Sequence, residues 1–464
     1  RRWSREHARA LAPPADSISA AAYPDQGVRE YTAGATAMLS PGRWTWTLLA
    51  GIDGYRLEHV AENTGPFPAS IDPTLRSGTG AGYRATFRAG GTTRVVEQDD
   101  GTAADVSVAL EHSVLRQQTA VMRPASPDQH YGTSATELRE EWAHDTGVLA
   151  QASGAWRNTL YGTVGMRVER NDAFGGGSEL STLPMLGAAW VRTFGLAEVK
   201  LRAAYGRGIR SPHVPARDNL RVYEPHGFGG AYVLGPEAQA GFELGAELYS
   251  QRGVSLQLTR FDQRATGLIQ DVVTAVDSVV RDGHPERHVR YLPQNVGAVT
   301  NRGWEMQAGL RRGPLSLTGA LALVDSRVER VAAQYGGDLQ PGDRMLAVPA
   351  RTAGLTAEWA AERWSGSLTA SRAWDWINYD RLALAAAFGA DWADWRQFSG
   401  AQLRTFWRRY DGSTNLRATA TRQVTPTVWL LLTGDNLLGR QLGEPDNVTI
   451  RAGRTLTLGI RTSF

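Results

Sequence analysis

Hydrophobic and polar residues alternate with a period of two along most of the chain. In its last segment, Leu456, Leu458, Ile460 and Phe464 fall on one side, and mostly polar residues fall between them. This period is typical of a β-strand with one apolar and one polar face, because successive side chains of a strand point to opposite sides. A terminal strand that ends in Phe suggests the closing strand of a bacterial outer-membrane barrel, and an edge strand of an ordinary sandwich is the alternative.

The same alternation recurs in pairs of segments joined by very short turns. Residues 28–39 and 44–57 form the first pair. The Ser-Pro-Gly sequence at 40–42 between them favours a tight turn. Longer polar stretches separate the pairs, among them 60–79, 117–141, 211–236 and 270–299. We predict about 17 strands, at residues 28–39, 44–57, 83–97, 104–116, 144–156, 159–170, 183–194, 198–209, 237–250, 254–269, 301–312, 315–327, 348–359, 364–376, 413–423, 427–435 and 455–464.

Short turns and long connections alternate in phase with strand direction along the whole chain. All short turns are therefore expected at one end of the sheet and all long loops at the other. Outer-membrane barrels have this asymmetry, with short periplasmic turns and long extracellular loops. A soluble sandwich or propeller has no reason to keep its long loops at one end. We therefore expect an all-β fold, an antiparallel transmembrane β-barrel.

The two faces of the predicted strands agree with this interpretation. In residues 237–250, four polar residues share one face and four apolar residues share the other: Glu237, Gln239, Glu243 and Glu247 against Phe242, Leu244, Ala246 and Leu248. A soluble fold would bury the apolar row, whereas a barrel would turn it to lipid and line a wet lumen with the acidic row. Periodicity cannot separate these readings, and the number and length of the strands favour the membrane.

Aromatic residues lie near the ends of many predicted strands: Trp44, Trp156, Tyr205, Trp304, Trp359, Trp364 and Trp374. Aromatic girdles at the two interfaces of a membrane would produce this placement, because amphipathic rings settle at headgroup depth. Scattered aromatic residues of a protein core are the alternative explanation.

Composition excludes several other classes of protein. No run approaches the eighteen or so apolar residues of a membrane helix, and the mean hydropathy is −0.33. The chain has no cysteine, so it has no disulfide or thiolate metal site. A net charge of +3 is too small to indicate nucleic-acid binding. No HExxH, GxSxG, P-loop or catalytic-triad pattern appears, so we expect neither an enzyme nor a bound cofactor.

One pair of histidines has the spacing of a metal site on a helix. His284 and His288 are four residues apart, but Pro285 follows the first and no third ligand lies nearby. We therefore expect a solvated loop there and no metal site.

Several stretches resemble TonB-dependent outer-membrane receptors. They are LYGTVGMRVERND (160–172), KLRAAYGRGIRSP (200–212), GPEAQAGFELGAEL (235–248), NVGAVTNRGWEMQAGL (295–310), PGDRMLAVPARTAGL (341–355), DNLLGR (435–440) and GRTLTLGIRTSF (453–464). Their order and spacing cover about residues 144–464, and the strand pattern extends the match upstream. Arg351 stands where the family usually has His.

The resemblance implies a barrel of 22 strands with a plugged lumen, of which this chain would supply about 17. Residues 28–39 would be about the sixth strand, residues 1–26 a remnant of an upstream loop or strand, and residues 27–464 the barrel domain. The N-terminal plug, its energy-coupling peptide and about five strands are then expected to be absent from this chain.

The family's function is the uptake of a scarce solute across the outer membrane of a Gram-negative bacterium. The resemblance implies that the solute is a ferric siderophore, haem, cobalamin or a glycan. The implied partners are outer-membrane lipid and lipopolysaccharide, a small-molecule or chelate ligand, and the TonB-ExbB-ExbD complex, which would act through the plug. A passive porin is one alternative, and a soluble β-propeller or sandwich that binds glycans is another.

Ligand recognition is expected in the long loops, because loops on a rigid scaffold usually carry it. Two stretches, 211–236 and 377–410, combine arginine or histidine with aromatic residues, which suits an anionic chelate or an aromatic ligand. The candidate ligand-binding residues are His213, Arg217, Arg221, Tyr223, His226, Tyr379, Arg381, Trp392 and Trp395. The alternative is that these residues pack the loops together or lie among lipid headgroups.

Overall fold

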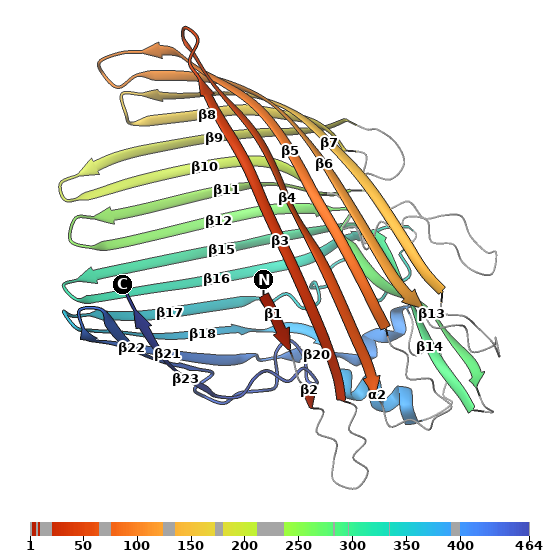
Figure 1. The fold of residues 1–464 in the computed structure, drawn as a ribbon. Coiled ribbons are helices and arrows are strands. Elements are labelled where there is room, and N and C mark those ends of the chain that lie inside the picture. Colours follow the sequence, from red (N-terminus) through yellow and green to blue (C-terminus); the bar gives the residue numbers. More distant parts are fainter. Residues whose placement is uncertain are drawn as a thin grey trace.

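The chain forms one large, curved antiparallel sheet in the computed structural model (Figure 1). The structure describes residues 2–5, 8–9, 21–64, 76–123, 135–171, 180–210, 236–281, 284–295, 297–333, 335–390 and 400–463. The main sheet has 19 strands, of which β1 (Arg2–Arg5) and β2 (Ala8–Arg9) are short segments on the edge of β3.

The other 17 strands of this sheet match the predicted number. They are β3 (Ala21–Leu39), β4 (Trp44–Thr64), β5 (Arg76–Glu97), β6 (Ala103–Arg123), β7 (Ala135–Trp156), β8 (Leu160–Asn171), β9 (Leu180–Phe194), β10 (Ala197–Arg210), β11 (Glu237–Ser250), β12 (Val254–Thr266), β15 (Gly297–Arg312), β16 (Leu315–Val331), β17 (Arg351–Ala360), β18 (Trp364–Trp374), β21 (Ser413–Thr425), β22 (Val428–Asp435) and β23 (Thr455–Thr462). Each pairs antiparallel with the next one in this order. The predicted all-β, antiparallel barrel architecture is confirmed.

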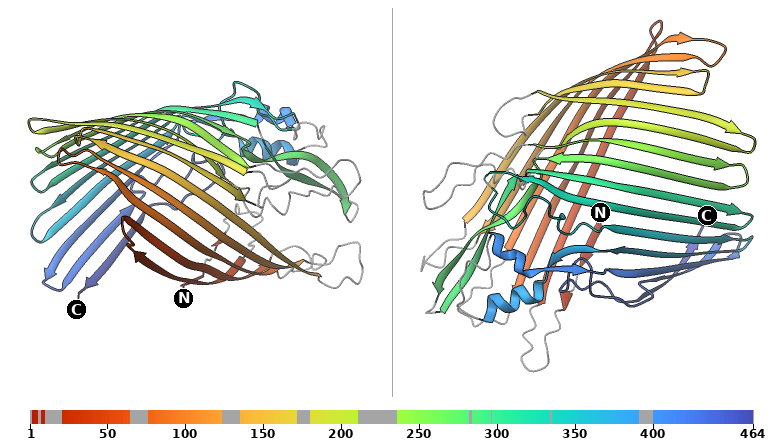
Figure 2. Two further views of the ribbon diagram at one scale, coloured as in Figure 1. Left: turned by 90° about the horizontal axis from the view of Figure 1, so that it is seen from above. Right: turned by 180° about the vertical axis from the view of Figure 1, so that it is seen from behind.

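The short turns all lie at one rim of the sheet and the long connections at the other (Figure 1). Figure 2 shows that the sheet curls, so that its N-terminal and C-terminal strands come to the same side of the molecule. Among the pairings of described residues, none joins β23 to β3. We call the two ends the turn rim and the loop rim.

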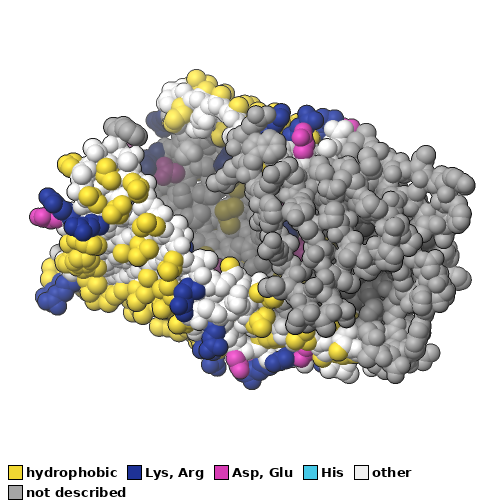
Figure 3. Space-filling model, turned by 60° about the horizontal axis from the view of Figure 1, so that its bottom comes forward, with side chains coloured by type: hydrophobic (Ala, Val, Ile, Leu, Met, Phe, Trp, Pro, Cys, Tyr) yellow, Lys and Arg dark blue, Asp and Glu magenta, His cyan; other side chains and the backbone are white. Residues whose placement is uncertain are grey.

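Apolar side chains cover the outer face, as the barrel interpretation requires. On β11, Phe242 is 62% and Leu244 59% exposed, whereas the Glu247 side chain on the opposite face of the strand is only 10% exposed. On β23, Leu458 and Ile460 are 75% and 70% exposed. Figure 3 shows hydrophobic side chains gathered on the outer surface toward the turn rim, around a hollow interior. A single sheet with its apolar face outward is not a sandwich with a dry core between two layers.

The inner face carries charges that pair within strands and across them. Glu247 of β11 accepts from Arg202 at 3.0 Å and lies 3.3 Å from the ammonium of Lys200, both on β10. On β8, Arg167 pairs with Glu169 at 2.5 Å and lies 3.6 Å from Glu111 of β6. These rows line the inside of the curved sheet, so the inner face is polar where the outer face is apolar.

Strand ends and connections differ from the sequence expectations. β4, β5, β6 and β7 extend into the stretches 60–79 and 117–141 that we expected to be loop. The expected loop 270–299 contains the hairpin of β13 (Ile269–Arg281) and β14 (His284–Asn295), which places His284 and His288 on a strand. Their side chains lie outside the described part of the structure.

The connection from β18 to β21 also has structure of its own. It contains β19 (Trp376–Tyr379), the helix α2 (Arg381–Ala390), the 3₁₀ helix η2 (Gly400–Phe406) and β20 (Trp407–Tyr410), with β19 and β20 paired. In the described part of the chain, no helix is long and apolar enough to cross a membrane. The expected division of the chain at residue 26 stays a prediction.

Buried apolar side chains form a small cluster near the loop rim. Val299, Val328, Leu339 and Met345 are at most 7% exposed, and they join β15 and β16 to the connection that follows β16. The sheet is therefore held mainly by its hydrogen-bonded ladders, and packing is concentrated where the connections meet.

Gly253, in the turn between β11 and β12, is expected to tolerate no side chain. Its φ of +81° is a left-handed conformation, and an added Cβ would lie 2.3 Å from the Arg311 carbonyl oxygen. Gly195 has φ +59° but no heavy atom within 4 Å of the same position. Both alanine variants lose about 1–2 kcal/mol through the left-handed conformation, and Gly253→Ala loses more through the clash. Thermal unfolding of the two variants measures the difference, and equal midpoints would contradict it.

Candidate functional site

A groove opens on the inner face where β10, β11 and β12 reach the loop rim. Its volume is about 630 Å³. It is lined by Ala204, Tyr205, Gly206, Arg207, Gly208, Ile209, Arg210, Glu237, Ala238, Gln239, Gly241, Glu243, Gln263, Ala265 and Leu268. We call it the mouth groove. Arg210 and Glu237, which line it, flank in the sequence the stretch 211–236, where we predicted ligand binding.

The floor of the mouth groove is bare backbone. Alternation on β10 places Ala204, Gly206 and Gly208 on the inner face, together with Arg202. A Cβ built on Gly206 or Gly208 has no heavy atom within 4 Å. Glycine at these positions therefore leaves open space that a solute could approach closely.

The walls of the mouth groove offer amide groups and charges that are already paired. Gln239 donates to Gln263 at 2.7 Å, and Gln263 donates to Glu243 at 3.4 Å. At the upper end, Arg210 and Glu237 lie 3.5 Å apart. Glu243 also has a cation nearby, at 3.6 Å on β10. The groove therefore presents hydrogen-bonding groups with little net charge.

A second groove, of about 450 Å³, lies on the same sheet at the turn rim. Its charged residues also pair with one another, because Arg94 contacts both Asp105 and Glu97 at 3.0 and 3.2 Å. This groove is remote from the loop rim, where the long connections gather.

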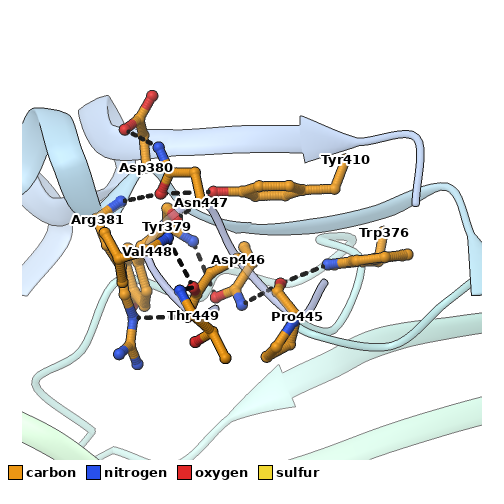
Figure 4. Close-up of polar contacts among 11 residues, drawn as sticks. Trp376, Tyr379, Asp380, Arg381, Tyr410, Pro445, Asp446, Asn447, Val448 and Thr449 are labelled. Atoms are coloured by element: carbon orange, nitrogen blue, oxygen red, sulfur yellow. Dashed lines mark hydrogen bonds and ion pairs between the residues drawn. The ribbon is translucent and has the colours of Figure 1, made fainter. Parts of the chain in front are cut away.

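The last long connection, between β22 and β23, is tied to β19, β20 and α2 by the sequence Glu-Pro-Asp-Asn at 444–447 (Figure 4). The Pro445 carbonyl accepts from Trp376 Nε1 at 2.9 Å and from Asn378 Nδ2 at 3.1 Å. Asn447 accepts from the Arg381 N–H at 3.0 Å and from the Tyr410 hydroxyl at 3.2 Å. We call this set of contacts the loop clamp.

Two aspartates anchor the loop clamp. Asp446, 2% exposed, accepts from the N–H groups of Val448 and Thr449 at 3.0 and 2.7 Å and pairs with Arg381 at 3.2 Å. Asp380 caps α2, because its carboxylate accepts from the Ala383 N–H at 2.9 Å. The clamp therefore fixes both the start of the helix and the turn at 445–449.

A third carboxylate joins the connection after β16 to the same region. Asp338, 4% exposed, accepts from the Tyr379 hydroxyl and from Trp407 Nε1, both at 2.7 Å. Arg404 of η2 donates to the Asp338 main-chain oxygen at 2.8 Å, and its guanidinium also pairs with Asp343. Burial and the neighbouring Asp338 carboxylate raise the pKa of Tyr379, so its hydroxyl stays protonated and donates.

The structure places two of the predicted ligand-binding residues, Tyr379 and Arg381, side by side in this network. Their polar groups hold connections together, and the Arg381 side chain remains 57% exposed. Their role in ligand binding stays a prediction. The other candidates lie outside the described residues: His213, Arg217, Arg221, Tyr223, His226, Trp392 and Trp395. Among the described residues, no group of acidic or histidine side chains could hold a metal ion.

Sequence reasoning missed most of the residues that build both features. The mouth groove could have been suspected from the Gly-x-Gly at 206–208, which leaves two inner positions of a strand without side chains. The loop clamp could have been suspected from Glu-Pro-Asp-Asn, because Asp and Asn side chains in turns often form hydrogen bonds with nearby main-chain groups.

The loop clamp is expected to weaken in acid. Burial would raise the pKa of Asp446, but the Thr449 and Val448 N–H groups and Arg381 together lower it. The Ala383 N–H and Asn447 likewise lower the pKa of Asp380. A depressed pKa stabilises the folded form above the unfolded value of about 3.9, and this stability is lost as the pH falls through the folded value.

We therefore expect a constant thermal midpoint from pH 7 to about 5 and a decline below about 4. Asp446→Asn, which cannot ionise, is expected to show a shallower decline than the unchanged protein. Identical slopes for the two proteins would contradict the assignment.

Comparisons with known proteins agree with this architecture. No curated protein sequence matches the chain. The family described as TonB dependent receptor-like, beta-barrel matches residues 3–437. The structure resembles the siderophore receptor PirA from Acinetobacter baumannii, with a TM-score of 0.61 and 13% identity, over 96% of this chain and 63% of that one.

Two further structures are similar. The copper transporter OprC has a TM-score of 0.64 and 14% identity, over 96% of this chain and 68% of that one. The RagAB peptide transporter has a TM-score of 0.65 and 11% identity, over 98% of this chain and 65% of that one. This chain therefore spans 63–68% of the length of these three proteins. At such identities the likeness shows the fold, whereas the family match covers most of the sequence. The chain belongs to the TonB-dependent receptor family, in its β-barrel region.

Proposed function

We propose that this chain is the barrel portion of a receptor that takes up a scarce solute across the outer membrane of a Gram-negative bacterium. Uptake would depend on the TonB-ExbB-ExbD complex, acting through a plug domain elsewhere in the whole protein. The solute would be a ferric siderophore, haem, cobalamin or a glycan. The observation that carries the proposal is a sheet with an apolar outer face, a charged inner face and all long connections at one rim.

The mouth groove supports a role in solute binding. It lies on the inner face directly below the loop rim, and Gly206 and Gly208 leave its floor open. Because Arg210, Glu237 and Glu243 on its inner face are paired with opposite charges, we infer that it receives an uncharged hydrogen-bonding part of the solute, such as an amide or hydroxyl group. Gln239 and Gln263 provide both donors and acceptors for such a group.

Membrane location is tested by extracting the full-length protein with detergent and comparing its gel mobility with and without boiling. A closed outer-membrane barrel stays folded in the unboiled sample and migrates differently. Solubility without detergent, together with an unchanged band, would overturn the membrane location.

Energised transport is tested in cells that express the full-length protein, with and without ExbB. The probes are radiolabelled ferric siderophores, haem, labelled cobalamin and labelled oligosaccharides. Uptake of at least one probe is expected, and it should disappear in the strain without ExbB. Uptake that persists in that strain would indicate a passive channel, which is the alternative function.

A further inference from the structure

The hairpin of β13 and β14 projects from the loop rim between β12 and β15 (Figures 1 and 2). It is a separate two-stranded antiparallel sheet, with a register shift between Val273 and Ala275. Beyond this shift the register is continuous as far as the pair of Arg281 and His284. Register partners share a face of a sheet, and so does every second residue along a strand. The register therefore sorts residues 275–281 and 284–290 into two faces.

The two faces of this segment differ in chemistry. One face is mostly apolar, and it holds the register pairs Val276 with Val289 and Val280 with Pro285. The opposite face holds two carboxylates and two imidazoles, in the register pairs Asp277 with His288, Val279 with Glu286, and Arg281 with His284. These faces follow from the backbone, because the side chains of the segment lie outside the described part of the structure.

Three residues of the ionisable face stand close enough together to share one metal ion. In antiparallel strands, residues directly opposite each other have Cα atoms about 4.5–5.5 Å apart, and diagonal neighbours are about 7–8 Å apart. Asp277 is directly opposite His288 and diagonal to Glu286. Glu286 is two residues from His288, which is about 7 Å along a strand. The three residues therefore form a compact triangle on one face.

His284 lies outside this triangle. It is four residues from His288, which is about 13 Å along a strand but less than half of that along a helix. From the sequence we expected no metal site, because a helix would pair the two histidines and no third ligand lies nearby. On the strand, the histidines are separated instead, and Glu286 and Asp277 become the neighbours of His288.

We propose that His288, Glu286 and Asp277 bind a divalent transition-metal ion, and that Zn²⁺ fits best. Zn²⁺ takes imidazole nitrogen and carboxylate oxygen as ligands, and three protein ligands leave its fourth position to water. The two carboxylates balance the charge of the ion. Mg²⁺ and Ca²⁺ require more oxygen ligands than this set provides, so they fit less well. The site is independent of the mouth groove and of the proposed uptake function.

The test uses the full-length protein, purified in detergent and stripped of metal with a chelator. Equilibrium dialysis against Zn²⁺ measures the number of bound ions and their affinity, and dialysis against Ca²⁺ measures selectivity. His288→Ala and Asp277→Asn each remove one ligand. His284→Ala is the matched control, because it removes the same residue type from the same face of the same strand. Thermal midpoints of the metal-free proteins show whether the variants fold.

We expect His288→Ala to bind one Zn²⁺ fewer than the unchanged protein at the same free concentration. Asp277→Asn should weaken this ion at least about tenfold, since the loss of even an outer-shell partner of a metal ligand has that effect. His284→Ala should bind like the unchanged protein, and Ca²⁺ should bind more weakly than Zn²⁺.

Three results would overturn the proposal. In the first, His288→Ala binds as many Zn²⁺ ions as the unchanged protein, with the same affinity. In the second, His284→Ala loses the same ion as His288→Ala, which would mean that the two histidines act as a pair. In the third, Ca²⁺ binds as tightly as Zn²⁺, which would indicate an unselective acidic surface. Unchanged thermal midpoints are expected for all three variants, because the hairpin lies outside the main sheet.

Discussion

Gly208→Trp is expected to lower solute affinity at least about tenfold, which corresponds to about 1.4 kcal/mol. The indole would extend from the floor of the mouth groove into space that no protein atom occupies within 4 Å of its Cβ. The φ of Gly208 is not in the left-handed region, so the strand accepts the side chain without backbone strain. Binding should therefore fall while the thermal midpoint stays unchanged. The measurement is equilibrium binding of whichever probe the uptake assay identifies.

A matched control is available on β17, elsewhere on the inner face. Gly354 of β17 also faces the inside and has no heavy atom within 4 Å of its built Cβ. Gly354→Trp adds the same bulk to the hollow interior but leaves the mouth groove open, so affinity should be retained. If both variants bind equally well, the groove is not the binding surface. If both lose binding, bulk anywhere in the interior is sufficient, and the groove has no special role.

Asp446→Ala is expected to have the largest effect on the loop rim. It removes the acceptor of the Val448 and Thr449 N–H groups and leaves Arg381 without its carboxylate. A hydrogen bond to a charged group contributes about 1.5–3 kcal/mol, so we expect a local loss of about 2–4 kcal/mol. Hydrogen exchange at these two amides should accelerate by at least about thirtyfold, the change that 2 kcal/mol produces.

The control for this variant is Asp411→Ala. Asp411 is exposed and lies at the end of the connection between β18 and β21, which the loop clamp contacts. Among the described residues, only its main-chain oxygen accepts a hydrogen bond, from Arg372. Exchange at Val448 and Thr449 should remain slow in this variant. Equal acceleration in both variants would show that any lost carboxylate loosens the rim, and the specific role of Asp446 would be wrong.

Strands and turns could be predicted because local rules determine them. Alternation sets the face of each residue, and turn chemistry such as Gln251-Arg252-Gly253 sets the hairpin, where Gly253 has φ +81°. Near the loop rim the prediction was less accurate. β6 continues to Arg123 and β7 begins at Ala135, and in these strand ends apolar and polar residues no longer alternate.

The loop clamp could not be predicted for a different reason. Its hydrogen bonds join residues far apart in sequence: Trp376 and Asn378 donate to Pro445, 69 and 67 positions away. Residue patterns along a single sequence do not indicate which connections contact each other in the fold. We selected Tyr379 and Arg381 because their side chains could bind a ligand. In the structure, these side chains hold two connections together through their contacts with Asp338 and Asp446. The mouth groove was missed because its floor consists of glycines, which carry no functional group to notice.

The position of Lys200 has a practical consequence. It is the only lysine of this chain, and its ammonium lies on the inner face, 3.3 Å from Glu247 and 36% exposed. An amine-directed dye would therefore have a single side-chain target here, and one reachable only by a reagent that enters the hollow. The chain thus carries its own reporter for whether that space is open or blocked.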